Sequence, residues 1–174
     1  MATAADVLGT HTREVPDFPT PGVVFKDLSP LFRDPQAFAT VLADIGDRWR
    51  GRVDVVAGIE ARGFIIGAPL AQAMGIGFVP IRKAGKLPGQ THTRSYDLEY
   101  GEATIEVAAD AFVPGCRVLL VDDVLATGGT AAAAAELIER AGARVTALEV
   151  LLELSFLHGR EKLPGRELHA IHVD

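Results

Sequence analysis

The stretch VLLVDDVLATGGTAAAAAELIER, residues 118–140, constrains the fold more than any other part of the chain. Residues 118–123 are almost continuously apolar up to two aspartates, which is typical of a central parallel strand covered on both faces. Residues 129–141 are rich in alanine and predict a helix. A strand that turns through glycines into a helix leaves free backbone amides at the helix N-terminus, where the helix dipole favours anions. The stretch therefore predicts an anion site.

The residues of this turn suit phosphate. Gly128 and Gly129 let the backbone approach a ligand closely and adopt positive φ, and Thr127 and Thr130 add hydroxyl donors. No lysine precedes the final threonine, as a Walker loop requires, and no G-x-G-x-x-G follows a strand. These absences disfavour a P-loop nucleotidase and a dinucleotide dehydrogenase.

Two neighbouring acids, Asp122 and Asp123, stand just before the predicted phosphate turn. Carboxylates facing a phosphate would repel it, so we expect them to face another part of the same ligand. Vicinal sugar hydroxyls suit them, because carboxylates accept strongly from such donors. The stretch is thus interpreted as a grip on a ribose 5-phosphate. The alternative is that the two acids only cap the strand and the helix.

Strand and helix patterns alternate along the rest of the chain, which favours an α/β fold with a central parallel sheet flanked by helices. With 174 residues, 48% of them hydrophobic, the chain has the length and apolar content of a single domain over residues 1–174. Four prolines disfavour regular structure in much of residues 17–35, and we expect a small hood over about 14–34. The polar residues 84–103 lack helical periodicity and predict a flexible loop, about 84–100. Helices are expected at 35–51, 64–75 and 129–141, and strands at 52–60, 76–83, 104–112, 116–123 and 144–154.

Composition excludes several partners. A net charge of −6 argues against non-specific binding to nucleic acid or to an anionic membrane surface. The single cysteine, Cys116, cannot form an intramolecular disulfide. No apolar run approaches the roughly 20 residues needed to cross a bilayer, and the N-terminus lacks an apolar signal core. We therefore expect a cytoplasmic protein with small-molecule partners.

The motif VLLVDDVLATGGT resembles the phosphoribosyl-diphosphate motif of the type I phosphoribosyltransferases. The segments DFPTPGVVFKDLSPL, GIEARGFIIGAPLA, VPIRKAGKLPG, YDLEYG and LLELSFLHGREKL resemble, in the same order, segments of the adenine phosphoribosyltransferase family. The resemblance covers about nine tenths of the chain, from Asp17 onward. It implies the predicted sheet and hood, a flexible catalytic loop, and a reaction in which adenine and phosphoribosyl diphosphate give AMP and diphosphate with the help of Mg²⁺.

The same resemblance assigns residues to phosphoribosyl diphosphate. Asp122 and Asp123 hold the ribose hydroxyls and stabilise the developing cation, and Arg62 binds diphosphate. Part of the basic segment formed by Arg82, Lys83 and Lys86 serves the neighbouring subunit of a homodimer. Mg²⁺ is expected on substrate oxygens, with no protein metal site. The 5-phosphate cradle is Ala126, Thr127, Gly128, Gly129 and Thr130, and the cations that neutralise the leaving group are Arg82, Lys83 and Lys86.

For the binding of adenine, the resemblance indicates an apolar wall in the hood and a residue that packs against the base from the opposite side. Lys26 stands where the family often has arginine. Glu99 is implied to take the N9 proton of adenine, and Tyr100 to seat the flexible loop. We interpret His92 as a loop histidine, and His169 and His172 as residues on opposite faces of a strand, which disfavours a metal pair. The residues that the resemblance places around the adenine base are Val24, Phe25, Lys26 and Leu154.

Two alternatives remain at this point. The acceptor could be another base, such as xanthine, hypoxanthine or orotate. A different class is a regulator that senses phosphoribosyl diphosphate without catalysis, although 174 residues with an acidic balance leave no room for a DNA-binding segment.

Overall fold

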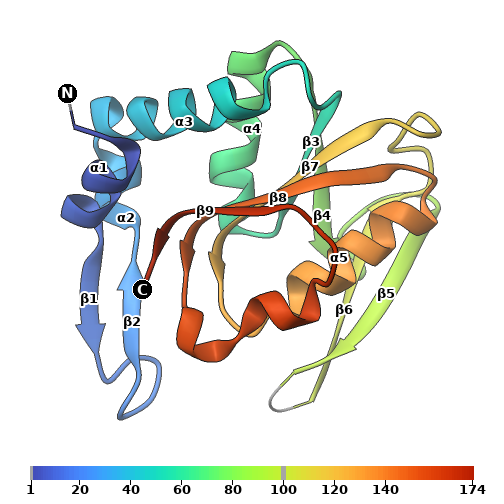
Figure 1. Ribbon diagram of the computed structural model, residues 1–174. Coiled ribbons are helices and arrows are strands. Elements are labelled where there is room, and N and C mark those ends of the chain that lie inside the picture. The colour runs from blue at the N-terminus through green and yellow to red at the C-terminus, as the bar shows by residue number, and fades with distance from the viewer. Residues whose placement is uncertain (1, 99–100) are drawn as a thin grey trace.

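A mixed seven-stranded sheet forms the centre of the computed structural model, which describes residues 2–98 and 101–174 (Figure 1). The strand order is β5-β6-β4-β3-β7-β8-β9. The pairs β4–β3, β3–β7, β7–β8 and β8–β9 are parallel, and β6 and β5 add an antiparallel edge. The predicted α/β class is confirmed. The strands are β3 (Val55–Ile59), β4 (Gly77–Lys83), β5 (Thr91–Asp97), β6 (Glu102–Ala108), β7 (Arg117–Leu125), β8 (Arg144–Glu153) and β9 (Leu168–Val173).

Helices cover both faces of this sheet. One core cluster joins α1 (Ala4–His11), α2 (Ser29–Arg33), α3 (Pro35–Trp49) and α4 (Arg62–Met74) to one face, and a second joins α5 (Gly129–Arg140) to the other. Helix α4 lies very close to the sheet, since a Cβ added at Gly63 would stand 2.7 Å from the carbonyl oxygen of Val121. This close approach brings the start of α4 beside the end of β7.

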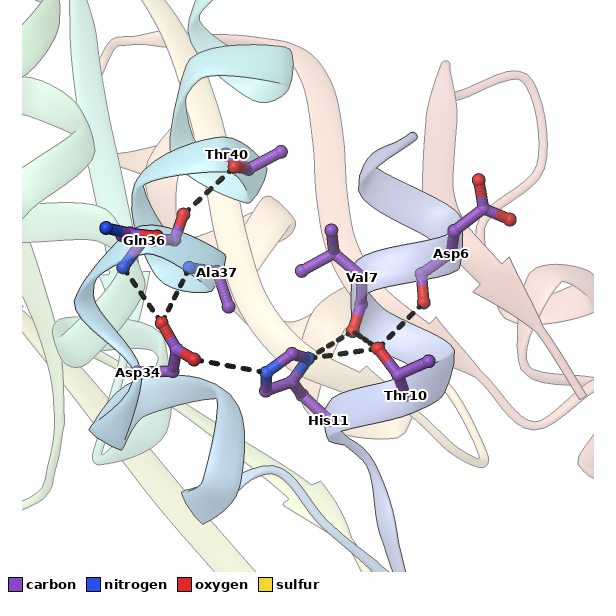
Figure 2. A network of polar contacts seen from close by, with 8 residues as sticks. All are labelled: Asp6, Val7, Thr10, His11, Asp34, Gln36, Ala37 and Thr40. Carbon is purple, nitrogen blue, oxygen red and sulfur yellow. Dashed lines mark hydrogen bonds and ion pairs between the residues drawn. The ribbon is translucent and has the colours of Figure 1, made fainter. Parts of the chain in front are cut away.

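The N-terminal helix α1 was not predicted from the sequence. Thr3 and Asp6 form a capping box at its start, and Leu8 is fully buried. Figure 2 shows how the end of α1 meets α3: His11 Nε2 lies 3.4 Å from Asp34 Oδ2, and Asp34 also caps α3. The capping signal is short, and the polar composition around it concealed the helix.

The hood contains more regular structure than its prolines suggested. Strands β1 (Arg13–Pro16) and β2 (Val24–Asp27) form a separate two-stranded antiparallel sheet, in which Val15 pairs with Phe25. Two short strands tolerate the prolines because these stand at strand ends or in the connecting turn. The hood lies at one side of the molecule, next to the C-terminal end of β9 (Figure 1).

The prediction of a loop over about 84–100 is partly wrong, because β5 occupies seven of these residues. Each of these residues pairs with β6, from Thr91 with Ala108 to Asp97 with Glu102. One side of the resulting hairpin packs along α5, where Arg94 Nε donates to Glu136 Oε2 at 2.7 Å. The polar side chains fit a strand here because they find partners on α5 rather than a place in the core.

Two 3-10 turns, η1 (Ser155–Leu157) and η2 (Gly159–Lys162), follow β8. None of the helices in the described part of the chain is both long and apolar enough to cross a membrane.

Candidate active site

A cavity of about 660 Å³ opens at the carboxyl ends of β3, β7 and β8, beneath the hood. This edge of a parallel sheet is where ligands of α/β proteins bind. We call it the hood cavity. It brings together ten of the predicted site residues: Val24, Phe25, Lys26, Arg62, Lys83, Asp122, Asp123, Ala126, Thr130 and Leu154.

The two aspartates occupy different environments although they are neighbours. Strand β7 continues to Leu125, two residues beyond Asp123, so both acids lie inside the strand instead of after it. Asp123 is buried, with 5% of its surface exposed, and forms an ion pair with Arg62. Burial and then the charge of Asp123 raise the pKa of Asp122 well above its usual value. Asp123 therefore has a cationic partner, whereas ionisation of Asp122 is disfavoured.

The turn after β7 has the geometry of an anion cradle. Gly128 is the N-cap of α5 with φ of +79°, a left-handed conformation that glycine adopts without strain, and among the described residues no side chain caps this helix. A Cβ at Gly128 would stand 2.2 Å from the carbonyl oxygen of Gly159, so η2 packs directly behind the turn. A smaller cavity of about 90 Å³ opens here, lined among others by Ala126, Thr127, Gly128, Gly129 and Thr130.

The hood supplies an apolar wall that faces this polar floor. Phe25 packs edge-to-face on Phe18 with ring centroids 5.2 Å apart, and the guanidinium of Arg62 lies 5.6 Å from the Phe25 ring centroid. Leu154 lines the same cavity from the end of β8. A planar aromatic ligand between Phe25 and Leu154 would therefore lie close to both Arg62 and the acids of β7.

Comparisons with known proteins agree with this geometry. Residues 34–164 match the phosphoribosyl transferase domain model. The adenine phosphoribosyltransferase of Thermobifida fusca is 57% identical over 166 residues, which cover 95% of this chain and 94% of the relative. The chain belongs to the adenine phosphoribosyltransferase family.

Solved structures of this family superpose closely on the chain. The adenine phosphoribosyltransferase of Thermoanaerobacter pseudethanolicus has a TM-score of 0.94 at 44% identity, covering 98% of this chain and 99% of that one. The Saccharomyces cerevisiae enzyme, solved with an imino-altritol bisphosphate and adenine, has a TM-score of 0.93 at 38% identity over 97% of this chain and 98% of that one. The resemblance noted in the sequence is confirmed.

Lys26, expected beside the base, uses its ammonium group elsewhere. Its Nζ lies 2.7 Å from Glu14 Oε1 and 2.6 Å from Asp174 Oδ2. These two acceptors, Asp174 first, raise the pKa of Lys26. The side chain still borders the hood cavity, but both acids hold its charge.

The basic segment divides between two places. Lys83 lines the hood cavity, whereas Arg82 and Lys86 are not among the residues lining it. Arg82 instead pairs with Glu60 at 3.2 Å and donates to the carbonyl oxygen of Lys86 at 3.0 Å. Strand pairing orients Arg82, because alternate residues of β4 point to opposite faces.

Three other predicted positions have different outcomes. His92 lies in β5, paired with Val107, so its interpretation as a loop residue is wrong. His169 contacts the buried Glu149, with Nδ1 2.9 Å from Glu149 Oε1. Glu99 and Tyr100 lie outside the described residues, and their predicted roles stay predictions. Within residues 2–98 and 101–174, no group of three or more His, Cys, Asp or Glu side chains is placed to hold a metal ion.

Sequence reasoning missed Glu60 and Tyr96, which both line the hood cavity. Glu60 Oε2 accepts the backbone amide of Lys83 at 2.8 Å and so fixes the end of β4. The hydroxyl of Tyr96 accepts a hydrogen bond from Thr130 Oγ1 at 3.1 Å. Tyr96 was hidden because its segment was interpreted as a loop.

Proposed function

We propose that this protein is a purine salvage enzyme that transfers the 5-phosphoribosyl group from phosphoribosyl diphosphate to adenine, forming AMP and diphosphate. One observation carries the proposal: the hood cavity and the smaller cavity that shares Ala126 and Thr130 with it unite an apolar wall for a base, acids for a ribose and an amide-rich turn for a phosphate. Family membership at high identity supports the same reaction.

In this proposal the 5-phosphate binds the turn from Ala126 to Thr130, where free amides and the α5 dipole favour an anion. Asp123 and Asp122 accept the ribose hydroxyls. Displacing diphosphate from C1 creates positive charge on the sugar, and carboxylates already held in place stabilise that charge without reorganising. The ion pair with Arg62 supports this role, since it holds the side chain of Asp123 in place.

Adenine would lie between Phe25 and Leu154. Strand β2 belongs to a two-stranded sheet, so no strand of the described residues pairs with its edge facing away from β1, and that edge can present backbone N–H and C=O groups to a base. The 6-amino group of adenine requires an acceptor opposite it, which a backbone carbonyl provides. The ammonium of Lys26 is held by two acids, which weakens the case for its donating to a 6-oxo group.

The leaving diphosphate would meet Arg62 and Lys83. Mg²⁺ fits this donor set as an ion held mainly by substrate oxygens, with Asp122 as a cavity carboxylate that forms no ion pair among the described residues. The ion supplies neutralisation of diphosphate charge when bound. Glu99 remains our proposed acceptor of the N9 proton, and Tyr100 the residue that seats the loop.

We also infer a single domain that acts as a homodimer in the cytoplasm. Arg82 and Lys86 lie outside the lining of their own hood cavity, which suits cations that reach a second copy's site. The free Cys116 fits a reducing compartment. Sedimentation at micromolar concentration tests the dimer: a monomer at full activity would contradict it.

A panel of bases tests the proposed reaction. Purified protein with phosphoribosyl diphosphate and Mg²⁺ is offered adenine, hypoxanthine, guanine or orotate, and the nucleotide formed is identified. A mismatched 6-substituent leaves buried polar groups unpaired, so adenine should be preferred by at least about a thousandfold in kcat/KM. Equal formation of AMP and IMP would overturn the choice of base. DNA binding without AMP formation would instead indicate the sensing regulator.

A further inference from the structure

We propose that Tyr96 is a positioning residue for the transfer reaction, which couples the 5-phosphate turn to the β5–β6 hairpin through Thr130. The inference rests on the proposed function, because it deepens the role of the same site. Tyr96 is near the end of β5, and Thr130 is the second residue of α5. Their hydroxyl groups lie 3.1 Å apart.

The contact lies where hairpin and cradle meet. Tyr96 is half-buried against the core and lines the hood cavity together with Thr130. A Cβ added at Gly129 would stand 3.8 Å from Tyr96 Cδ2 and 3.8 Å from the carbonyl oxygen of Asp97. The end of β5 therefore packs directly on the first turn of α5.

Two further contacts hold β5 along the same helix. Arg94 Nε donates to Glu136 Oε2 at 2.7 Å, and Arg140 donates to the carbonyl oxygen of Thr93 at 3.1 Å. These contacts lie farther from the hood cavity, since neither Glu136 nor Arg140 lines it. Among the described contacts between β5 and α5, the Tyr96–Thr130 hydrogen bond is thus the one whose two residues both line the hood cavity.

The direction of the Tyr96–Thr130 hydrogen bond must change when phosphate binds. Thr130 Oγ1 now donates to Tyr96. A phosphate oxygen only accepts, so Thr130 must donate to the substrate, and its oxygen is then free to accept from the Tyr96 hydroxyl. Two hydrogen bonds in series polarise and strengthen each other. An occupied cradle therefore holds the hairpin more firmly than an empty one.

Steady-state kinetics of Tyr96→Phe test this coupling. A neutral hydrogen bond changes an equilibrium by about two- to twelvefold, so KM for phosphoribosyl diphosphate should rise within that range. KM for adenine at saturating phosphoribosyl diphosphate should stay unchanged. Ser95→Ala is the matched control, because it removes a hairpin hydroxyl that contacts Thr104 instead of α5. Equal KM values in wild type and Tyr96→Phe would overturn the proposal while leaving the proposed reaction intact.

A double-mutant cycle separates positioning from a general structural effect. Thr130→Val removes the middle hydroxyl, so Tyr96→Phe should cost nothing more for phosphoribosyl diphosphate in that background. Lys86, exposed in the segment that leads into β5, supplies a second measurement. Phosphoribosyl diphosphate should slow tryptic cleavage there in the wild type and less so in Tyr96→Phe. Additive losses in the cycle, or equal protection of both proteins, would contradict the coupling.

Discussion

Asp122 and Asp123 show how two identical side chains acquire different properties from their positions in one strand. Successive residues of β7 point to opposite sides, and Asp123 meets Arg62 whereas Asp122 forms no ion pair among the described residues. Burial of Asp122, and then the charge of Asp123, disfavour ionisation of Asp122 and raise its pKa. This interdependence predicts a specific effect of pH on catalysis.

We predict that Asp123→Asn moves the acid limb of the kcat/KM profile for phosphoribosyl diphosphate to lower pH. The pKa of Asp122 is raised partly by the charge of Asp123, so removing that charge lowers it and keeps Asp122 ionised in more acidic solution. Losing a hydrogen bond to a charged group should also reduce the plateau by about tenfold to a hundredfold.

The control for this prediction is Asp47→Asn, which changes an exposed acid on α3 far from the hood cavity. Its profile should coincide with that of the wild type. An acid limb that moved to higher pH in Asp123→Asn would contradict our account of the pair.

At the scale of elements, the sequence was most informative where one local pattern determines the structure. Residues 118–140 form the expected strand, turn and helix because apolar burial, glycine and helix propensity all agree there. It was least informative where tertiary contacts decide. Strand β5 depends on pairing with β6 and on partners along α5, which no local pattern contains.

The site followed the same division. Residues inside the sequence motifs were predicted, and ten of them line one cavity. The two ion pairs of Lys26 were not predicted, because its partners Glu14 and Asp174 stand 12 and 148 positions away along the chain. The contact of Tyr96 with Thr130, 34 residues apart, could not be read from spacing for the same reason.

The turn η2 touches no substrate in the proposed reaction, but it packs against the phosphate turn. A Cβ on Gly159 would stand 2.3 Å from the carbonyl oxygen of Ala126, so Gly159→Ala must displace the phosphate turn. Such overpacking costs about 1–3 kcal/mol. We expect Tm to fall by roughly 2–10 °C, and KM for phosphoribosyl diphosphate to rise more than KM for adenine.

Gly9→Ala is the matched control, because a Cβ at Gly9 meets nothing within 4 Å and the residue lies inside α1. Alanine is the better helix former, so this variant should keep or raise Tm. Finding Gly159→Ala as stable and as active as Gly9→Ala would show that η2 does not support the phosphate turn.

At the scale of the whole molecule, the hood is fixed to the body near the base site by a bridge between distant parts of the chain. Lys26 on β2 binds Glu14 on β1 and Asp174 beyond β9. Asp174 is itself held, since its amide donates to the carbonyl oxygen of Glu153 at 2.9 Å and its carbonyl accepts from Ser155 Oγ at 2.7 Å. The bridge therefore ties the hood to the end of β8, immediately beside Leu154.

We predict that Asp174→Asn weakens binding of adenine more than binding of phosphoribosyl diphosphate. Removing one carboxylate loosens the hood wall that Phe25 contributes, while the cradle at the start of α5 keeps its own support from η2. A partly exposed ion pair is worth up to about 1 kcal/mol, so KM for adenine should rise by at most about fivefold. Salt should shrink the difference between the two proteins, because it screens the pair in the wild type. Glu167→Gln serves as the control, since it breaks the exposed Arg52–Glu167 pair, 2.8 Å long, which joins residues outside the hood. If Asp174→Asn raised KM for phosphoribosyl diphosphate alone, the bridge would be acting on the cradle and not on the hood.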